Sequence, residues 1–115
     1  MIYVFESELP ENKPVFISLT KIYGIGLNKA LLLCKNVGLA KNIKVKELSS
    51  DQINKILKTA DFLNLTVGSD LKKNKLMISK NLISIKTYRG LRKYQGLPVR
   101  GQRTHTNGKT ANKRK

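Results

Sequence analysis

The clearest helical signal in this 115-residue chain is SSDQINKILKTA, residues 49–60. Ser49 and Gln52 have the spacing of a capping box, in which each side chain accepts a hydrogen bond from the backbone N–H of the other residue. The apolar residues that follow recur at helical spacing and give one stripe: Ile53, Ile56, Leu57 and Ala60. The segment therefore predicts a helix that packs one face against a core.

Further helices are predicted on both sides of this segment. We expect a short helix over residues 15–22 and a second over 27–36, separated by a break at Tyr23–Gly26. Gly38 suits the left-handed position that often ends a helix. Before them, Pro10 and Pro14 favour an extended N-terminal arm over residues 1–14.

A fourth helix is predicted from Asp70 to about Lys86. From Thr87 onward glycine is frequent and the apolar periodicity disappears, so we expect an extended tail with turns, ordered mainly by its partner. The predicted fold is therefore mostly α, with a small helical body that includes the N-terminal arm (residues 1–86) and a long extended basic C-terminal tail (residues 87–115).

Charge divides the chain at residue 70. The net charge is +16, from 23 Lys and Arg against seven Asp and Glu. All seven acids lie in residues 1–70, whose nine Lys leave a net charge of +2, whereas residues 71–115 carry fourteen Lys and Arg and no acid, which gives +14. A domain this small gains nothing from so much self-repulsion without a polyanion, so the pattern favours a nucleic-acid partner.

Enzyme chemistry finds little support in the sequence. His105 is the single histidine and has no acid near it in sequence, and no phosphate-binding loop with Gly-Lys-Ser/Thr is present. Cys34 is the single cysteine and lies in an apolar run, which favours a buried thiol over a reactive or metal-binding one. We expect no catalytic residue, no metal, no cofactor and no membrane span.

Two segments carry residues suited to RNA. Tyr88–Arg103 alternates cations with glycine and two tyrosines, and arginine can chelate phosphate while tyrosine stacks on unpaired bases. At Tyr23–Gly26, a glycine hairpin between two helices can either point free backbone N–H groups at a phosphate or merely make the turn. The sequence leaves these two interpretations of the hairpin about even.

The tail sequence resembles a known family. YRGLR at residues 88–92, followed by GLPVRGQRTHTN at 96–107, resembles the signature of ribosomal protein S-thirteen, and LTKIYGIG at 19–26 resembles that family's first glycine hairpin. The resemblance covers nearly the whole chain. It implies a helical body with a helix–two-turn–helix element, and a tail that crosses rRNA in the head of the small subunit.

The resemblance also implies partners and contact residues. Family members lie beside small-subunit protein S-nineteen, form inter-subunit bridges that include large-subunit protein L-five, and approach peptidyl-site tRNA through the extreme C-terminus, where this chain has Lys113, Arg114 and Lys115. The residues expected to bind rRNA are Gly24, Gly26, Lys29, Tyr88, Arg89, Arg92, Lys93, Arg100, Gln102, Arg103, Thr104, His105 and Asn107.

Departures from the family bear on the origin of the chain. The part after Asn107 is shorter and poorer in Arg than in typical bacterial members, and His105 resembles mitochondrial members. The acidic N-terminus lacks the features of a secretory or transit peptide, and Lys, Asn and Ile, which AT-rich genomes encode, are abundant. We expect an organelle-encoded protein of the mitochondrial ribosome in the matrix, with bacterial cytoplasm or plastid as alternatives.

Two other functions each fit one feature of the sequence. A DNA-binding or DNA-repair module also uses glycine hairpins between helices, but a repair enzyme would need a catalytic residue and more chain. Binding to a membrane surface would need an apolar face beside the cations.

Overall fold

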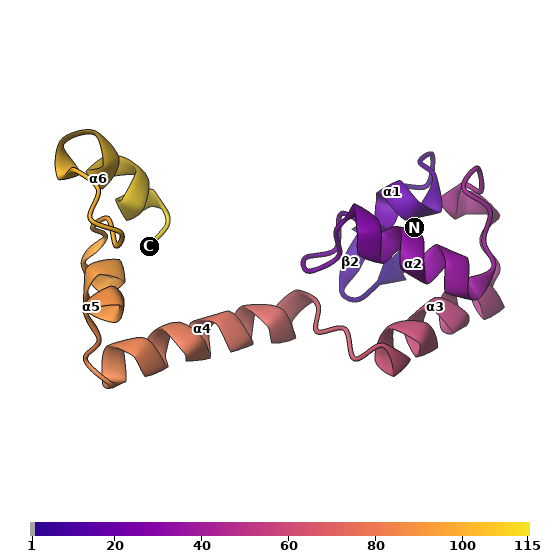
Figure 1. Ribbon diagram of the computed structural model, residues 1–115. Coiled ribbons are helices and arrows are strands. Elements are labelled where there is room, and N and C mark those ends of the chain that lie inside the picture. Colours follow the sequence, from indigo (N-terminus) through magenta and orange to yellow (C-terminus); the bar gives the residue numbers. More distant parts are fainter. Residues whose placement is uncertain (1) are drawn as a thin grey trace. The chain divides into compact units, whose positions relative to one another are not determined.

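The predicted capping box forms at the start of helix α3 (Ser50–Phe62) in the computed structural model, which describes residues 2–115 (Figure 1). The backbone N–H of Gln52 donates to Ser49 Oγ at 3.3 Å, and the N–H of Ser49 donates to Gln52 Oε1 at 3.1 Å. Ile56 and Ala60, on the predicted stripe, are buried. The sequence pattern therefore predicted both the N-terminal cap and the buried face of α3 correctly.

The chain before α3 folds into a hairpin and two helices. The elements are β1 (Ile2–Val4), β2 (Ser7–Leu9), α1 (Val15–Leu19), α2 (Leu27–Val37) and a 3-10 turn η1 (Val45–Glu47). β1 and β2 pair antiparallel, with Ile2 opposite Leu9 and Val4 opposite Ser7. The expected extended arm is thus a β-hairpin, and both predicted helices are present.

Helix α2 ends as the sequence predicts. Gly38 has φ 79°, in the left-handed region, and its N–H donates to the carbonyls of Cys34 and Lys35. The next N–H, from Leu39, donates to the Cys34 carbonyl at 2.9 Å. These bonds satisfy carbonyls that the helix end would otherwise leave without partners, and they turn Leu39 back into the core.

One aliphatic core joins these elements. Side chains from the hairpin, α1, α2, η1 and α3 pack together, and α2 contacts both α1 and α3. The largest fully buried hydrophobic side chains are Leu9, Leu19, Ile22, Leu33, Ile56, Val4, Val15 and Val45. Cys34 belongs to the same core, and burial raises the pKa of its thiol above the usual value. This agrees with the prediction of a buried cysteine.

Three helices follow: α4 (Gly68–Ser84), α5 (Tyr88–Gln95) and α6 (Thr104–Lys113). The fourth helix was predicted two residues too late, and Asp70 lies in its first turn, where a carboxylate favours the positive end of the helix dipole. The expectation of an extended tail is not confirmed, because residues 88–95 and 104–113 are helical. The mostly α fold class is confirmed.

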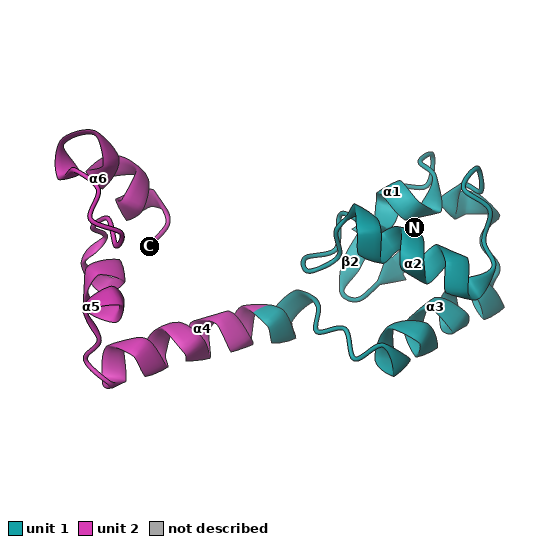
Figure 2. Ribbon diagram, viewed as in Figure 1, with its two compact units in different colours: residues 1–71 teal, residues 72–115 magenta. Residues whose placement is uncertain are grey.

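The chain forms two compact units, residues 1–71 and 72–115 (Figure 2). This division nearly coincides with the change in charge, since residues 72–115 contain all fourteen C-terminal cations and no acid. The predicted boundary between a helical body and a basic RNA-binding tail, at residues 86 and 87, stays a prediction. Among the described residues, no helix is long and apolar enough to cross a bilayer.

Candidate RNA-binding site

The second unit depends on close contact between α4 and α5. A Cβ atom added at Gly90 would lie 2.6 Å from both the carbonyl carbon and the carbonyl oxygen of Leu82. Thr87 caps α5 by accepting from the Gly90 N–H at 3.1 Å, and its hydroxyl donates to the Leu82 carbonyl at 3.0 Å. Glycine is therefore required at position 90 because the two backbones meet there.

A second glycine joins α5 to α6. Gly96 ends α5 with φ 73°, and a Cβ atom there would lie 2.7 Å from Asn112 Oδ1 in α6. The loop after Gly96 is held by Arg92, whose Nε donates to the Pro98 carbonyl at 3.1 Å. Arg92 thus supports the loop from a half-buried position, a role that the sequence did not indicate.

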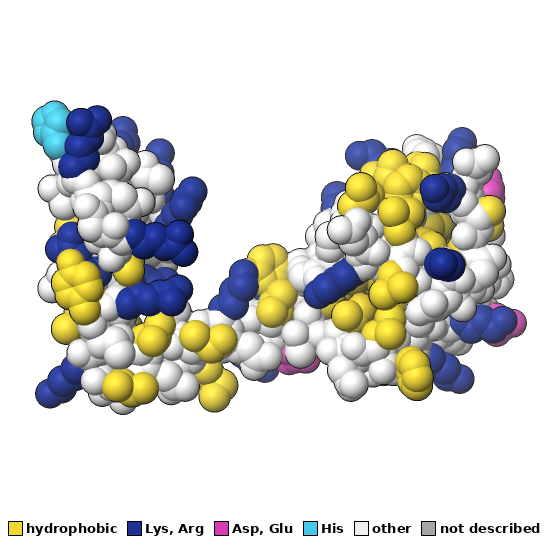
Figure 3. Space-filling model, viewed as in Figure 1, with side chains coloured by type: hydrophobic (Ala, Val, Ile, Leu, Met, Phe, Trp, Pro, Cys, Tyr) yellow, Lys and Arg dark blue, Asp and Glu magenta, His cyan; other side chains and the backbone are white. Residues whose placement is uncertain are grey.

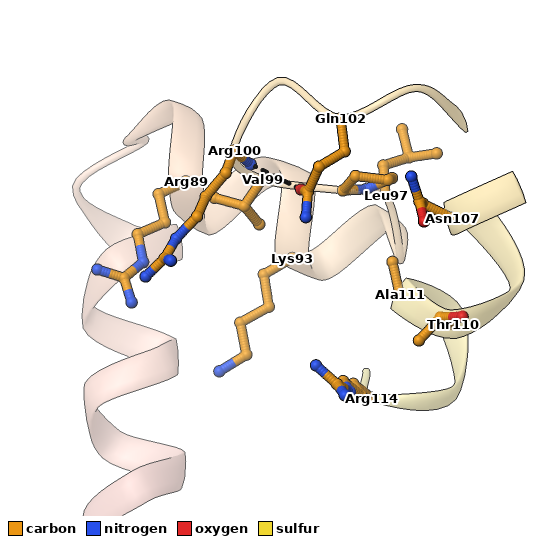
Figure 4. A pocket seen from close by; sticks show the side chains of 11 residues that line it. Arg89, Lys93, Leu97, Val99, Arg100, Gln102, Asn107, Thr110, Ala111 and Arg114 are labelled. Atoms are coloured by element: carbon orange, nitrogen blue, oxygen red, sulfur yellow. Dashed lines mark hydrogen bonds between the residues drawn. The ribbon is translucent and has the colours of Figure 1, made fainter. Parts of the chain in front are cut away.

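Together α5, the loop and α6 surround a hollow of about 640 Å³ (Figure 4). Four cations line it: Arg89, Lys93, Arg100 and Arg114. Polar groups come from Gln102, Asn107 and Thr110, and the apolar surface comes from Leu97, Pro98, Val99 and Ala111. Figure 4 shows the guanidinium groups of Arg89 and Arg100 beside each other, with Arg114 across the opening.

The spacing along the helices explains this convergence. Arg89 and Lys93 are four residues apart on α5, so they share one face. Asn107, Thr110 and Arg114 recur at three- and four-residue intervals along α6 and its end, which places them together as well. The hollow thus lies between two polar helix faces, and its cations are drawn from segments up to 25 residues apart in the chain.

The electrostatics of the unit favour an anion. Residues 72–115 contain no Asp or Glu, so no side-chain carboxylate of this unit neutralises the four cations at the hollow. Figure 3 shows Lys and Arg side chains gathered over the part of the chain that contains α5 and α6. Arginine can bind a phosphate with two parallel N–H donors, and the pair formed by Arg89 and Arg100 offers two such groups.

Several predicted contact residues lie outside the hollow. Tyr88 and Tyr94 are exposed, and each ring faces a cation, Arg92 at 5.9 Å and Lys115 at 5.7 Å from the ring centroid. Arg103 Nε donates to Thr106 Oγ1 at 3.1 Å at the start of α6. The remaining three are exposed residues of α6 that do not line the hollow: Thr104, His105 and Lys113.

The glycine hairpin lies in the first unit, and its two glycines have different surroundings. Gly24 has φ 102°, and a Cβ atom there would lie 3.1 Å from the Thr66 carbonyl and 2.8 Å from Leu71 Cδ2. It makes the turn and allows close packing against residues 66–71. Gly26, at the N-cap of α2, has φ −94° and would meet no atom within 4 Å. Lys29 Nζ donates to the Gly24 carbonyl at 3.3 Å.

Sequence reasoning missed part of the lining. Thr110 and Ala111 were not singled out because helix α6 was not predicted, and Leu97, Pro98 and Val99 were considered only within the family signature. The absence of an apolar stripe in THTNGKTANK left no periodic signal for α6. In residues 2–115 no group of three or more His, Cys, Asp or Glu side chains is placed to hold a metal ion.

Comparison with known proteins identifies the family. The family model for ribosomal protein S13/S18 matches residues 3–64 and 59–110. A "Small ribosomal subunit protein uS13m" from Marchantia polymorpha is 48% identical over 113 residues, covering 98% of this chain and 93% of that protein. A protein of the same name from Daucus carota is 42% identical over 119 residues, covering 98% and 97%. The chain therefore belongs to the ribosomal protein S13/S18 family, as a mitochondrial structural protein of the small ribosomal subunit and not an enzyme.

Proposed function

We propose that this protein binds rRNA in the head of the mitochondrial small subunit, mainly through residues 87–115. The observation that carries the proposal is the hollow of the second unit, where Arg89, Lys93, Arg100 and Arg114 converge and residues 72–115 supply no side-chain carboxylate to neutralise them. A concave cationic surface of this kind suits phosphates, which supply most of the affinity in nucleic-acid binding.

The remaining contacts belong to the same proposal. Exposed residues around the hollow extend the RNA surface: Tyr88, Arg103, Thr104 and His105. Asn107 contributes from within the hollow, which it lines. In the first unit, Gly26 and Lys29 offer a second contact with the phosphate backbone, at the start of α2. By family resemblance we also propose contact with small-subunit protein S-nineteen, a bridge to large-subunit protein L-five, and encoding in the organelle.

The C-terminal cluster is proposed to approach peptidyl-site tRNA. Lys113, Arg114 and Lys115 end the chain. Arg114 also lines the hollow, and Lys115 lies over Tyr94, so only Lys113 lacks a role within the second unit. The cluster therefore spans the rRNA surface and the end of α6.

The salt dependence of rRNA binding tests the main proposal. Each phosphate contact contributes about 0.7 to 0.9 to the slope of log affinity against log salt. The double variant Arg89→Gln/Arg100→Gln should make that slope shallower, reducing its magnitude by about 1.4 to 1.8. The matched control is Lys55→Gln/Lys58→Gln, which removes the same charge from exposed positions of α3 and should leave the slope nearly unchanged.

Two outcomes contradict the proposal. Equal slopes for the native chain and the Arg89/Arg100 variant would place the RNA surface elsewhere. Tighter binding to duplex DNA of the same length than to small-subunit rRNA would favour the alternative of a DNA-binding module. Each titration is made by filter binding with the full-length chain at several salt concentrations.

A further inference from the structure

The hollow in the second unit differs from a surface that binds phosphate alone. A phosphate needs only cations or N–H donors, and an open or convex surface can supply them. Here four cations surround an interior that also contains the side chains of Leu97, Val99 and Ala111 (Figure 4). Its volume of about 640 Å³ falls within the range of sites that enclose a small organic ligand.

The two kinds of lining match the two parts of a nucleotide. Apolar side chains and the flat faces of guanidinium groups are surfaces on which an unpaired base can lie. The arginines at the edge can bind the attached phosphate with paired N–H donors. No aromatic ring lines the hollow, so stacking would use the guanidinium planes of Arg89 or Arg100.

Gln102 adds directional hydrogen bonding. Its Oε1 accepts from the Arg100 backbone N–H at 3.3 Å, so the NH₂ group of the amide is left as a donor (Figure 4). Asn107 and Thr110 face the same hollow with further donors and acceptors. Hydrogen bonds from amide groups are one means by which proteins recognise the edges of unpaired bases.

Two contacts within the second unit support this arrangement. Gly96 allows Asn112 of α6 to approach the end of α5, and the bond from Arg92 Nε to the Pro98 carbonyl fixes the loop. A site that is already formed loses less entropy on binding than one that folds around its ligand. The hollow is therefore suited to a defined ligand as well as to general attraction of phosphate.

We infer that the hollow binds one unpaired nucleotide of the rRNA, with the base inside and its phosphate at Arg89 and Arg100; this inference rests on the proposed rRNA-binding function. The observation that carries it is the combination of apolar side chains, a hydrogen-bonded Gln102 amide and four cations around one hollow. A backbone contact alone would leave the interior unoccupied.

Filling the interior tests the inference without changing charge. Ala111→Trp places an indole in the hollow. The control is Ile85→Trp, which places the same ring at an exposed position just after α4, outside the hollow. For Ala111→Trp we expect rRNA affinity to fall about tenfold or more, the loss that one stacked base represents. The salt slope should stay near the native value, because Ala111→Trp removes no cation and the arginines at the edge can still bind phosphate.

Chemical probing of the bound rRNA provides the second measurement. Reagents that modify exposed base edges should show one unpaired nucleotide that the native chain protects and that Ala111→Trp leaves reactive. Gln102→Met, which keeps the length of the side chain but removes its amide, should weaken the same protection while circular dichroism stays native. This second variant keeps the test valid if the indole disturbs α6.

The outcomes separate this inference from the proposed function. Native-like affinity and protection in both Ala111→Trp and Gln102→Met would overturn the nucleotide site, even if Arg89→Gln/Arg100→Gln still lowers the salt slope. Protection spread evenly along a backbone, with no single base involved, would also overturn it. A native chain that fails to bind small-subunit rRNA would overturn both proposals.

Discussion

The two units of this protein are stabilised by different means. The first unit, residues 1–71, has a net charge of +2 and a core of aliphatic side chains that includes Leu19, Leu33 and Ile56. In the second unit, the residues buried from solvent are Gly90, Gly96 and Pro98, and the net charge is +14. The first unit is held together by apolar burial, and the second by close backbone contact and helix caps.

This difference explains how one small chain can be both stable and strongly cationic. Apolar burial needs no oppositely charged partner, so the first unit can fold alone. Like charges in the second unit repel one another until a polyanion neutralises them. A ligand that binds only the folded state stabilises it, so RNA should add stability to the second unit in particular.

Removing core volume in the first unit should have the largest effect on stability. Leu33→Ala deletes a fully buried core side chain of α2, and such changes cost about 2–5 kcal/mol of unfolding free energy. The buried Cys34 thiol, whose pKa burial raises, should then react faster with a thiol reagent at neutral pH. The protection of amides in residues 88–113 against hydrogen exchange should not change.

The matched control is Leu32→Ala on the same helix, where the side chain is largely exposed. It should leave both thermal unfolding and Cys34 labelling nearly as in the native protein. If the two variants are equally destabilised, the core does not lie where the structure places it.

Adding one methyl group in the second unit should destabilise that unit and leave the first unit unchanged. Gly90→Ala places a Cβ atom 2.6 Å from the Leu82 backbone, and overpacking of this kind costs about 1–3 kcal/mol. Exchange protection in α5 should fall and rRNA binding should weaken, while Cys34 stays protected. Hydrogen exchange followed by mass spectrometry measures both units at once.

Gly108→Ala in α6 provides the control, because its added Cβ atom meets nothing within 4 Å. Alanine favours a helix interior more than glycine does, so this change should keep or slightly raise protection in α6. A Gly90→Ala variant with native α5 protection would contradict the close contact with α4.

Two substitutions in the glycine hairpin should have smaller effects on stability, and together they distinguish turn formation from RNA contact. Gly24→Ala forces alanine into φ 102° beside the Thr66 carbonyl and should cost about 1–2 kcal/mol of stability. Gly26→Ala, with ordinary φ and open space, should cost less than about 1 kcal/mol, within the usual range for loss of a good cap.

A binding titration beside thermal unfolding then decides the role of the hairpin. Weaker rRNA binding by folded Gly26→Ala would support a phosphate contact at the start of α2. Native affinity in that variant would leave the hairpin with a turn-forming role alone.

The sequence predicted the first unit well because its signals are local. Ser49 and Gln52 specify a cap, Ile56 and Ala60 specify a face, and Gly38 specifies an end, each within a few residues. The strands of the hairpin were missed because each has only three residues, too few for a clear alternating pattern. The two-residue turn at Phe5 and Glu6, both with positive φ, also lacks the glycine or asparagine usual there.

The helices of the tail were missed because contacts far apart in the chain decide them. Gly90 inside a helix is unfavourable by propensity alone, and its reason lies in the backbone of Leu82. Charge pattern and family resemblance pointed to Arg89, Arg100 and Arg114 separately. Their meeting at one hollow depends on the position of α6, which Gly96 and Asn112 establish through a contact that the sequence pattern does not display.

The smallest expected effect concerns the end of the chain, where the three terminal cations have different surroundings. Arg114 lines the hollow, Lys115 lies over the Tyr94 ring, and Lys113 is exposed on α6. Deleting all three should leave the first unit folded and weaken peptidyl-site tRNA binding to purified small subunits by about 1 kcal/mol, the scale of a charged hydrogen bond. The loss should be similar for different tRNAs, because phosphate contacts carry no sequence information.

Single variants then assign the loss to one partner. If Lys113→Gln reproduces most of the tRNA effect while rRNA affinity stays native, the end of α6 contacts tRNA directly. If Arg114→Gln reproduces the tRNA effect and rRNA affinity falls in parallel, the loss of tRNA binding is indirect. It then follows from weaker binding of the second unit to rRNA, because Arg114 lines the rRNA-binding hollow. A deletion that weakens one tRNA only would contradict a phosphate contact, since every tRNA presents the same backbone chemistry to a cation.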